Sequence, residues 1–194
     1  DEDQEKLIKE LAAEEYSVRK SDPLIKQAIS YICSNKTEGI LPDDLQDKKP
    51  SFEGEKECIR LFTLYENKLF ETGNLDFDDL LYYAVKYIEK LTSETHLLFD
   101  YIIIDEYQDI SNIKYELTMK TAKRNDAKVF AVGDDWQSIY SFSGSRIEYI
   151  YNFTNYFKGA KLFKINKTYR NSQELINLSG QFIMKNNSQI KKDL

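Results

Sequence analysis

The sequence predicts an α/β fold with a parallel sheet, preceded by an all-helical N-terminal region. In residues 99–165, three short apolar runs alternate with two helical patterns, and strands that alternate with helices form parallel sheets. In residues 1–91, apolar side chains instead recur every three or four positions, which is the period of amphipathic helices. Gly39, Pro42, Pro50 and many charges interrupt this region and indicate a loop over residues 34–51.

The composition is that of a globular protein, and it limits the possible functions. Of the 194 residues, 41% are hydrophobic and 31% are charged, and the net charge is -6. A protein that coats duplex nucleic acid would be expected to be basic, because phosphate neutralisation drives that binding. Any binding of nucleic acid is therefore expected at a local site. The aromatic residues, 13% of the chain, could build a core or stack on bases.

The two cysteines do not predict a metal site. Cys33 and Cys58 are far apart and lack metal-ligand spacing, and His96 is the single histidine. Both thiols are expected to be buried or inert in a reducing cytosol. No signal peptide or long apolar span is present. The chain starts at Asp1 and ends at Leu194 without a clear stop signal, so both ends are interpreted as cuts in a longer protein.

The helical region contains four apolar stripes and two helix-start signals. Asp22 followed by Pro23 is typical of an N-cap and a first helical residue. The clearest helix is predicted over residues 74–91, with Asp76 as its cap. The remaining stripes are Leu7, Ile8, Leu11 and Ala12; then Leu24, Ile25, Ala28, Ile29 and Ile32; then Cys58, Phe62, Tyr65 and Leu69.

Three continuous apolar runs, over residues 101–104, 128–132 and 161–165, predict the strands. Such runs are typical of strands covered on both faces. Helices are expected over residues 113–122 and 147–157, and Ser145 with Glu148 matches a capping box for the second. Functional residues of parallel sheets collect at the carboxyl ends of strands. The residues that follow each run are therefore the candidate site.

The first run is followed by residues 105–109 (DEYQD), which place the adjacent acids Asp105 and Glu106 at the edge of the sheet. This is the arrangement of a Walker B element. The first acid can hold Mg²⁺, usually through water, and the second can orient the attacking water. Taken alone, the motif is as compatible with a purely structural role, a strand end followed by an acidic helix cap, as it is with a Walker B element.

The second run leads into residues 133–144 (GDDWQSIYSFSG), and the third into residues 166–171 (NKTYRN). Gly133 allows a tight exit from the strand, and Gln137 can hydrogen-bond a phosphate or water. The aromatics after it could stack on bases, although a turn with packed aromatics is the favoured interpretation in isolation. Arg170 could neutralise a transferred phosphate, whereas without context a surface ion pair is favoured.

Together, these three motifs resemble motifs II, III and IV of the UvrD-like superfamily 1A DNA helicases. The spellings GDDWQSIY and TYRN are most similar to the helicase IV branch, and residues 75–80 (LDFDDL) resemble a further signature of the family. The resemblance is specific over residues 74–183. It implies a RecA-like P-loop NTPase motor fold, in which residues 1–72 would be part of the helical 1B-like insertion. Residues 73–194 would form the C-terminal part of motor domain 1A.

The resemblance also implies roles for the nucleotide-site residues, with ATP and Mg²⁺ as cofactors. Asp105 would coordinate Mg²⁺, and Glu106 would act as the hydrolytic base. Gln108 would connect the nucleotide site to its surroundings. Gln137 would sense the γ-phosphate and report it to the DNA. The acids of residues 78–79 would be mainly structural and cap their helix.

Further roles implied by the resemblance concern the DNA and the adenine. Tyr140 and Phe142 would lie at or near single-stranded DNA, and Phe142 replaces a Trp that is common in other branches. Ser143 stands where many relatives carry Arg, so the resemblance does not extend to the phosphate or inter-domain contact of that Arg. Tyr169 would flank the adenine, and Arg170 would touch the γ-phosphate. The implied partners are single-stranded DNA and duplex junctions, with 3′ to 5′ movement, in a bacterial cytoplasm at the nucleoid.

One motif of the family is missing. No G-x-x-x-x-G-K-[ST] loop occurs, so the chain by itself is expected to lack useful ATP hydrolysis. An alternative is a module without this loop that binds DNA or a partner without turnover, although the intact acid pair favours the motor. A helicase–nuclease fusion is also compatible with these motifs. An unrelated α/β domain is a further alternative, and three motifs in the correct order argue against it.

Overall fold

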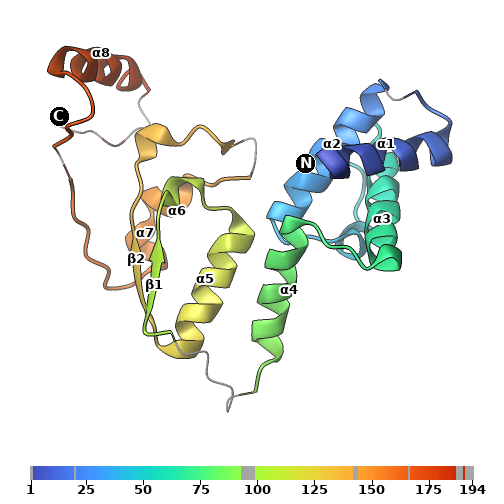
Figure 1. The fold of residues 1–194 in the computed structure, drawn as a ribbon, viewed down its shortest axis with the longest axis horizontal. Coiled ribbons are helices and arrows are strands. Elements are labelled where there is room, and N and C mark those ends of the chain that lie inside the picture. The colour runs from blue at the N-terminus through green and yellow to red at the C-terminus, as the bar shows by residue number, and fades with distance from the viewer. Residues whose placement is uncertain are drawn as a thin grey trace. The chain divides into compact units, whose positions relative to one another are not determined.

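The structure is a computed structural model that describes residues 2–19, 21–92, 99–141, 144–165, 167–186 and 190 (Figure 1). Contacts divide the chain into two units. The first comprises Asp1–Ile102 and Ser111–Lys128, and the second comprises Ile103–Ile110 and Val129–Leu194. Each unit is described by itself below. The domain boundary expected between residues 72 and 73 stays a prediction.

The first unit contains a helical core made by α1 (Glu2–Tyr16), α2 (Pro23–Thr37), α3 (Glu55–Thr72) and the short 3-10 helix η1 (Pro42–Leu45). The predicted stripes pack against one another in this core, as expected for amphipathic helices. The cap predicted at the start of α2 is confirmed, because Asp22 Oδ1 accepts a hydrogen bond from Leu24 N at 2.9 Å. The buried residues are Ile8, Leu11, Ala12, Ile25, Ala28, Ile32, Leu45, Cys58, Leu61, Phe62, Tyr65 and Leu69.

Two further helices of this unit, α4 (Phe77–Lys90) and α5 (Asn112–Asn125), lie side by side (Figure 1). The predicted cap of α4 is confirmed as a capping box. Asp76 Oδ1 accepts from Asp79 N at 2.8 Å, and Asp79 Oδ2 accepts from Asp76 N at 3.1 Å. The apolar stripe of α4 is only partly covered, since Val85 is buried but Phe77 is 74% exposed.

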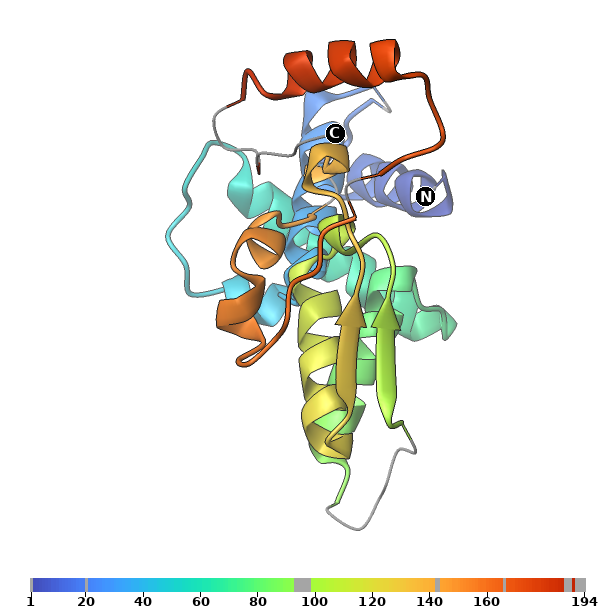
Figure 2. The ribbon, with the colours of Figure 1, turned by 90° about the vertical axis from the view of Figure 1, so that its left-hand side faces the viewer.

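Strands β1 (Tyr101–Ile104) and β2 (Lys128–Ala131) form a two-stranded sheet. They run parallel, as Figure 2 shows, with hydrogen bonds from Lys128 N to Asp100 O (2.9 Å) and from Val132 N to Ile104 O (2.8 Å). The prediction of burial on both faces is wrong. Along each strand, exposed residues alternate with half-buried ones, because the described structure covers only one side of this small sheet.

The second unit corrects two further predictions. Residues 161–165 are not a strand, and they have no regular structure. Leu162, Phe163 and Ile165 are 68%, 84% and 85% exposed, so no strand or core among the described residues covers them. In the described part of the chain, the sheet ends with β2.

The helix predicted over residues 147–157 is broken into α6 (Glu148–Tyr151) and α7 (Phe153–Tyr156) by the non-helical backbone of Asn152. Its predicted capping box is wrong as well. Arg146 N donates to Ile110 O at 3.0 Å, and the helix begins two residues later without a side-chain cap.

The remaining elements of this unit are short, except for α8 (Gln173–Ile183). The 3-10 helix η2 (Tyr107–Asp109) follows β1, and η3 (Asp135–Gln137) follows β2. Across both units, none of the helices that the structure describes is long and apolar enough to span a membrane.

Ionisable groups in the helical core predict a loss of stability at alkaline pH. Burial raises the pKa of the Cys58 thiol from 9.0 to about 11. Burial, together with a hydrogen bond to Glu55, raises the pKa of Tyr31 from 10.0 to about 12. The unfolded chain would lose these protons first, so the free energy of unfolding is expected to fall as pH rises from about 9 to about 12.

Urea unfolding followed by circular dichroism at pH 8, 9, 10 and 11 would measure this slope. The Cys58→Ala variant should show a shallower slope, because one of the groups is gone. An unchanged free energy of unfolding between pH 8 and pH 11 would contradict the prediction.

Candidate active site

The acid pair follows directly after β1. Asp105 and Glu106 are both exposed, and Asp105 Oδ1 accepts a hydrogen bond from Glu106 N at 2.9 Å. Glu106 has a left-handed backbone with φ 50° and ψ 45°, which is uncommon for a residue other than glycine. Strained backbone of this kind tends to occur at functional sites. The turn ends the strand and begins η2.

Gln108 lies next to this pair and is buried. Its Nε2 donates to Glu106 Oε2 at 2.7 Å, and its Oε1 accepts from Asp134 N at 2.9 Å. A Cβ added to Gly133 would lie 3.0 Å from Gln108 Oε1 and 3.1 Å from Gln108 N. Close approach to Gln108 therefore explains the glycine at this position. The ends of the two strands are joined at the sequence-predicted site.

The loop after β2 places Gln137 on η3. Asp134 caps this short helix, because its Oδ1 accepts from Trp136 N at 3.0 Å, and its Oδ2 accepts from Gln137 Nε2 at 2.8 Å. Gln137 is exposed, and Tyr140 is 48% exposed shortly after it. Phe142 lies outside the described residues, as do Ser143 and His96.

The third predicted motif is not brought to the acid pair. Tyr169 is 82% exposed, and Arg170 is exposed in the same irregular stretch. Lys167 Nζ lies 5.2 Å from the centre of the Tyr169 ring. Across the residues that the structure describes, no hydrogen bond or ion pair joins Tyr169 or Arg170 to Asp105, Glu106 or Gln137. Their roles in the nucleotide site stay predictions.

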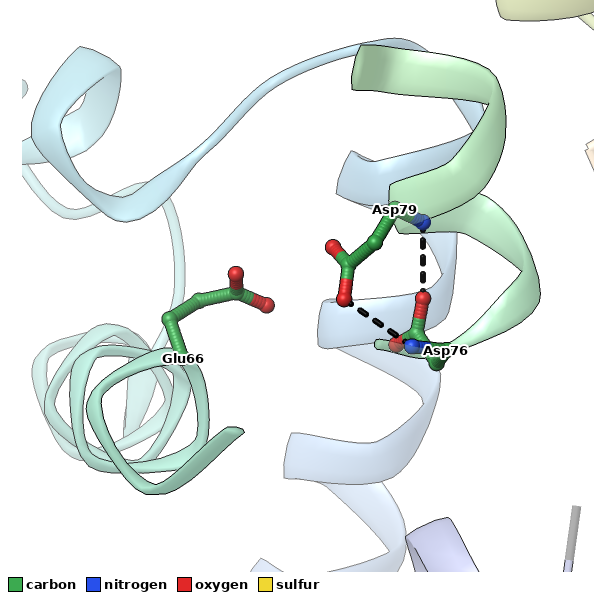
Figure 3. A group of neighbouring side chains, drawn as sticks. All are labelled: Glu66, Asp76 and Asp79. Atoms are coloured by element: carbon green, nitrogen blue, oxygen red, sulfur yellow. Dashed lines mark hydrogen bonds between the residues drawn. The ribbon is translucent and has the colours of Figure 1, made fainter. Parts of the chain in front are cut away.

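A buried group of charges in the first unit was missed by sequence reasoning. We call it the Lys36 cluster: Lys36, Glu66, Asp76 and Asp79. The three carboxylates, drawn in Figure 3, lie close enough to one another to hold a metal ion. However, Lys36 Nζ contacts all three, at 2.8 Å from Glu66, 2.7 Å from Asp76 and 2.5 Å from Asp79. The ammonium group therefore takes the place where a cation would bind.

The pKa values in the Lys36 cluster show two opposing effects. Burial lowers the pKa of Lys36, but hydrogen bonds to Asp76, Asp79 and Glu66 outweigh burial and raise it. Burial raises the pKa of Asp76, but hydrogen bonds from Lys36 and from the backbone outweigh burial and lower it. For Glu66, burial prevails and the pKa is raised. At neutral pH the lysine is charged.

The sequence contained one signal for the Lys36 cluster. Lys36 continues the buried stripe of α2 that includes Ile25, Ala28 and Ile32, and a lysine on an apolar face requires a partner. Asp79 acts structurally, as expected, because it caps α4 and also pairs with Lys36.

A cavity of about 310 Å³ lies in the same unit, at the end of α3 and the start of α4. Glu66, Leu69, Phe70, Leu75, Asp79 and Tyr83 are among its lining residues. None of the predicted site residues lines it, so we assign no ligand to it.

Comparisons with known proteins identify the family. Residues 1–158 match the UvrD/REP helicase N-terminal domain. Over its full length, the chain is 33% identical to DNA helicase II of Haemophilus influenzae and 32% identical to DNA helicase II of Escherichia coli. Over 98% of its length, it is 31% identical to the putative ATP-dependent DNA helicase YjcD of Bacillus subtilis.

The chain covers 26%, 27% and 25% of these three proteins, and so spans about a quarter of their length. The assignment to the helicase IV branch stays a prediction. The acid pair after β1 and the glutamine loop after β2 occur in the part of the chain that matches the family. The chain therefore belongs to the UvrD-like DNA helicases, with the UvrD/REP N-terminal domain over residues 1–158.

Proposed function

We propose that this chain is part of an ATP-dependent DNA helicase that couples ATP hydrolysis to movement on single-stranded DNA and to duplex unwinding. One observation carries the proposal: a strand delivers two exposed acids into a left-handed turn, and Gln108 bonds this turn to the glutamine loop of the next strand. The names of the relatives, which include ATP-dependent DNA helicases, support it. We place the activity in DNA repair or recombination.

In this proposal, Asp105 and Glu106 perform the chemistry of hydrolysis. Their exposed carboxylates are oxygen donors of the kind that Mg²⁺ prefers, and Asp105 would hold the ion through water. Bound Mg²⁺ would neutralise charge on the β- and γ-phosphates. Glu106 would accept a proton from water as the water oxygen bonds to the γ-phosphorus. The bond from that phosphorus to the bridging oxygen breaks, and ADP leaves with the electron pair.

The other residues are proposed to bind and to couple. Gln137 would contact the γ-phosphate and transmit its presence to DNA stacked on Tyr140 and Phe142. Tyr169 would flank the adenine, and Arg170 would stabilise charge on the γ-phosphate. We further propose a RecA-like P-loop fold for the complete motor domain, with residues 1–72 in its helical subdomain.

A second candidate function follows from the missing phosphate loop. Without a G-x-x-x-x-G-K-[ST] segment in these 194 residues, the chain could serve in a module that binds DNA or a partner protein without turnover. Hydrolysis by the full-length protein distinguishes the two candidates.

We expect the full-length protein to hydrolyse ATP faster when single-stranded DNA is added, and the isolated 194-residue chain to show no useful turnover. Phosphoryl transfer depends on positioning and electrostatics, and the isolated chain lacks the loop that would hold the phosphates. A coupled assay of ADP release, with and without an oligonucleotide, measures both proteins. Full-length protein that binds DNA without hydrolysis would support the binding module. Turnover by the isolated chain would show that the phosphate loop is not needed.

A further inference from the structure

The side-chain amide of Gln108 has a fixed orientation between two strand ends. Gln108 is 2% exposed. Its Nε2 faces the Glu106 carboxylate at 2.7 Å, and its Oε1 faces the backbone N–H of Asp134 at 2.9 Å. One neighbour can only accept and the other can only donate, so a flipped amide would lose both hydrogen bonds. The amide therefore presents a donor to the carboxylate of the proposed base.

The backbone around Gln108 leaves little freedom for this arrangement to change. Tyr107 N donates to Val132 O at 2.8 Å, which holds the start of η2 against the end of β2. A Cβ on Gly133 would lie 3.0 Å from Gln108 Oε1, which is tighter than nine in ten Cβ contacts in proteins. Glycine at position 133 thus allows the Gln108 side chain to lie close enough to accept the hydrogen bond from Asp134 N.

The hydrogen bonds continue from Gln108 to the proposed sensor. Asp134, whose N–H binds Gln108, also accepts from Gln137 Nε2 through its own carboxylate at 2.8 Å. Glu106, Gln108, Asp134 and Gln137 therefore form one connected series within the second unit. Contiguous series of this kind can carry energetic coupling between two groups, and a double-mutant cycle measures that coupling.

We propose that Gln108 is a positioning residue that orients the Glu106 carboxylate and couples it, through Asp134, to Gln137. The inference rests on the proposed function, because it requires Glu106 to be the base and Gln137 the sensor. A displacement of the loop that carries Gln137 would be transmitted to Glu106 through the amide. If the only role of Gln108 were to accept the hydrogen bond from Asp134 N–H, its amide would not also need to donate a hydrogen bond to Glu106.

Two substitutions in the full-length protein separate these roles. Gln108→Glu keeps the length of the side chain and an acceptor for Asp134 N, but it replaces the donor that faces Glu106 with a second carboxylate. Gln108→Asn keeps both polar groups but is one methylene too short to reach both partners. Each is expected to lower kcat of the DNA-stimulated ATPase by about 10- to 100-fold, as loss of an orienting partner does at other sites. The KM for ATP should change by less than about threefold, because binding groups are untouched.

The matched control is Gln46→Glu. Gln46 Nε2 also donates to a carboxylate, that of Asp43 at 3.0 Å, but the pair is exposed. This variant should retain the wild-type kcat. Thermal unfolding of all variants identifies any that do not fold; if one Gln108 variant fails to fold, the other decides. Folded Gln108 variants that retain kcat would overturn the proposal. A wild-type protein without DNA-stimulated ATPase would instead overturn the proposed function itself.

A separate experiment tests the coupling between Gln108 and Gln137. Gln108→Asn and Gln137→Ala are combined, and DNA stimulation is measured for each single variant and for the double variant. If the two residues act as one unit, the double variant loses no more than about the larger single loss. Losses that multiply would show that Gln108 and Gln137 act independently, and would overturn the coupling.

Discussion

The Glu106→Gln variant of the full-length protein is expected to lose about 10²- to 10⁴-fold in kcat for DNA-stimulated ATP hydrolysis, the contribution of a positioned general base. Glutamine keeps the shape of the side chain, and its carbonyl oxygen can still accept the hydrogen bond from Gln108 Nε2. It cannot accept a proton from the attacking water. The variant should therefore bind ATP nearly as well as wild type and stall before hydrolysis. Steady-state ADP release, together with titration of a fluorescent ATP analogue, separates the two steps.

Glu148→Gln provides the control for this experiment. Glu148 is an exposed glutamate in the first turn of α6, and no catalytic role is assigned to it. Its replacement should leave kcat unchanged. If Glu106→Gln turns over at the wild-type rate, another group is the base. If it loses ATP binding together with kcat, Glu106 acts in binding rather than in proton transfer.

The largest expected effect on stability comes from Lys36→Met. Methionine is similar in length, but it leaves Glu66, Asp76 and Asp79 without the ammonium group that contacts all three. Breaking a buried pair by removing one partner costs about 3–5 kcal/mol, because the remaining charge is buried and unpaired. Urea unfolding at pH 7, followed by circular dichroism, should show a loss of that order. Because burial raises the pKa of Glu66, protonation of this carboxyl should reduce the loss at lower pH.

Lys120→Met is the matched comparison. Lys120 Nζ lies 2.8 Å from Glu89 Oε1, about the same distance as in the Lys36 cluster, but the two side chains are 34% and 40% exposed. Exposed pairs typically contribute less than about 1 kcal/mol. Equal losses from the two substitutions would mean that the Lys36 cluster behaves like a surface pair, contrary to its burial.

Local patterns were enough to predict most helices and both observed strands. Asp22 and Asp76 were identified as caps from their positions before an apolar stripe, and both caps are present. A cap and a stripe involve residues within three or four positions of one another, so the sequence displays them directly. The positions of the acid pair and of Gln137 could be predicted for the same reason, because each follows closely after an apolar run in the sequence. The resemblance based on them agrees with the family that the comparisons identify.

Only the tertiary structure decided the features that depend on distant segments. Residues 161–165 have the composition of a strand, but a strand requires a neighbour, and none pairs with them in the described structure. Lys36 meets acids 30 and 40 positions away, and Gln108 meets Asp134 across 26 positions. Such contacts arise from how whole elements pack, and no periodicity in the sequence records them. The sequence by itself therefore determined helices α1 to α5, the two strands and the family, whereas packing decided the ionic cluster and the orientation of the proposed base.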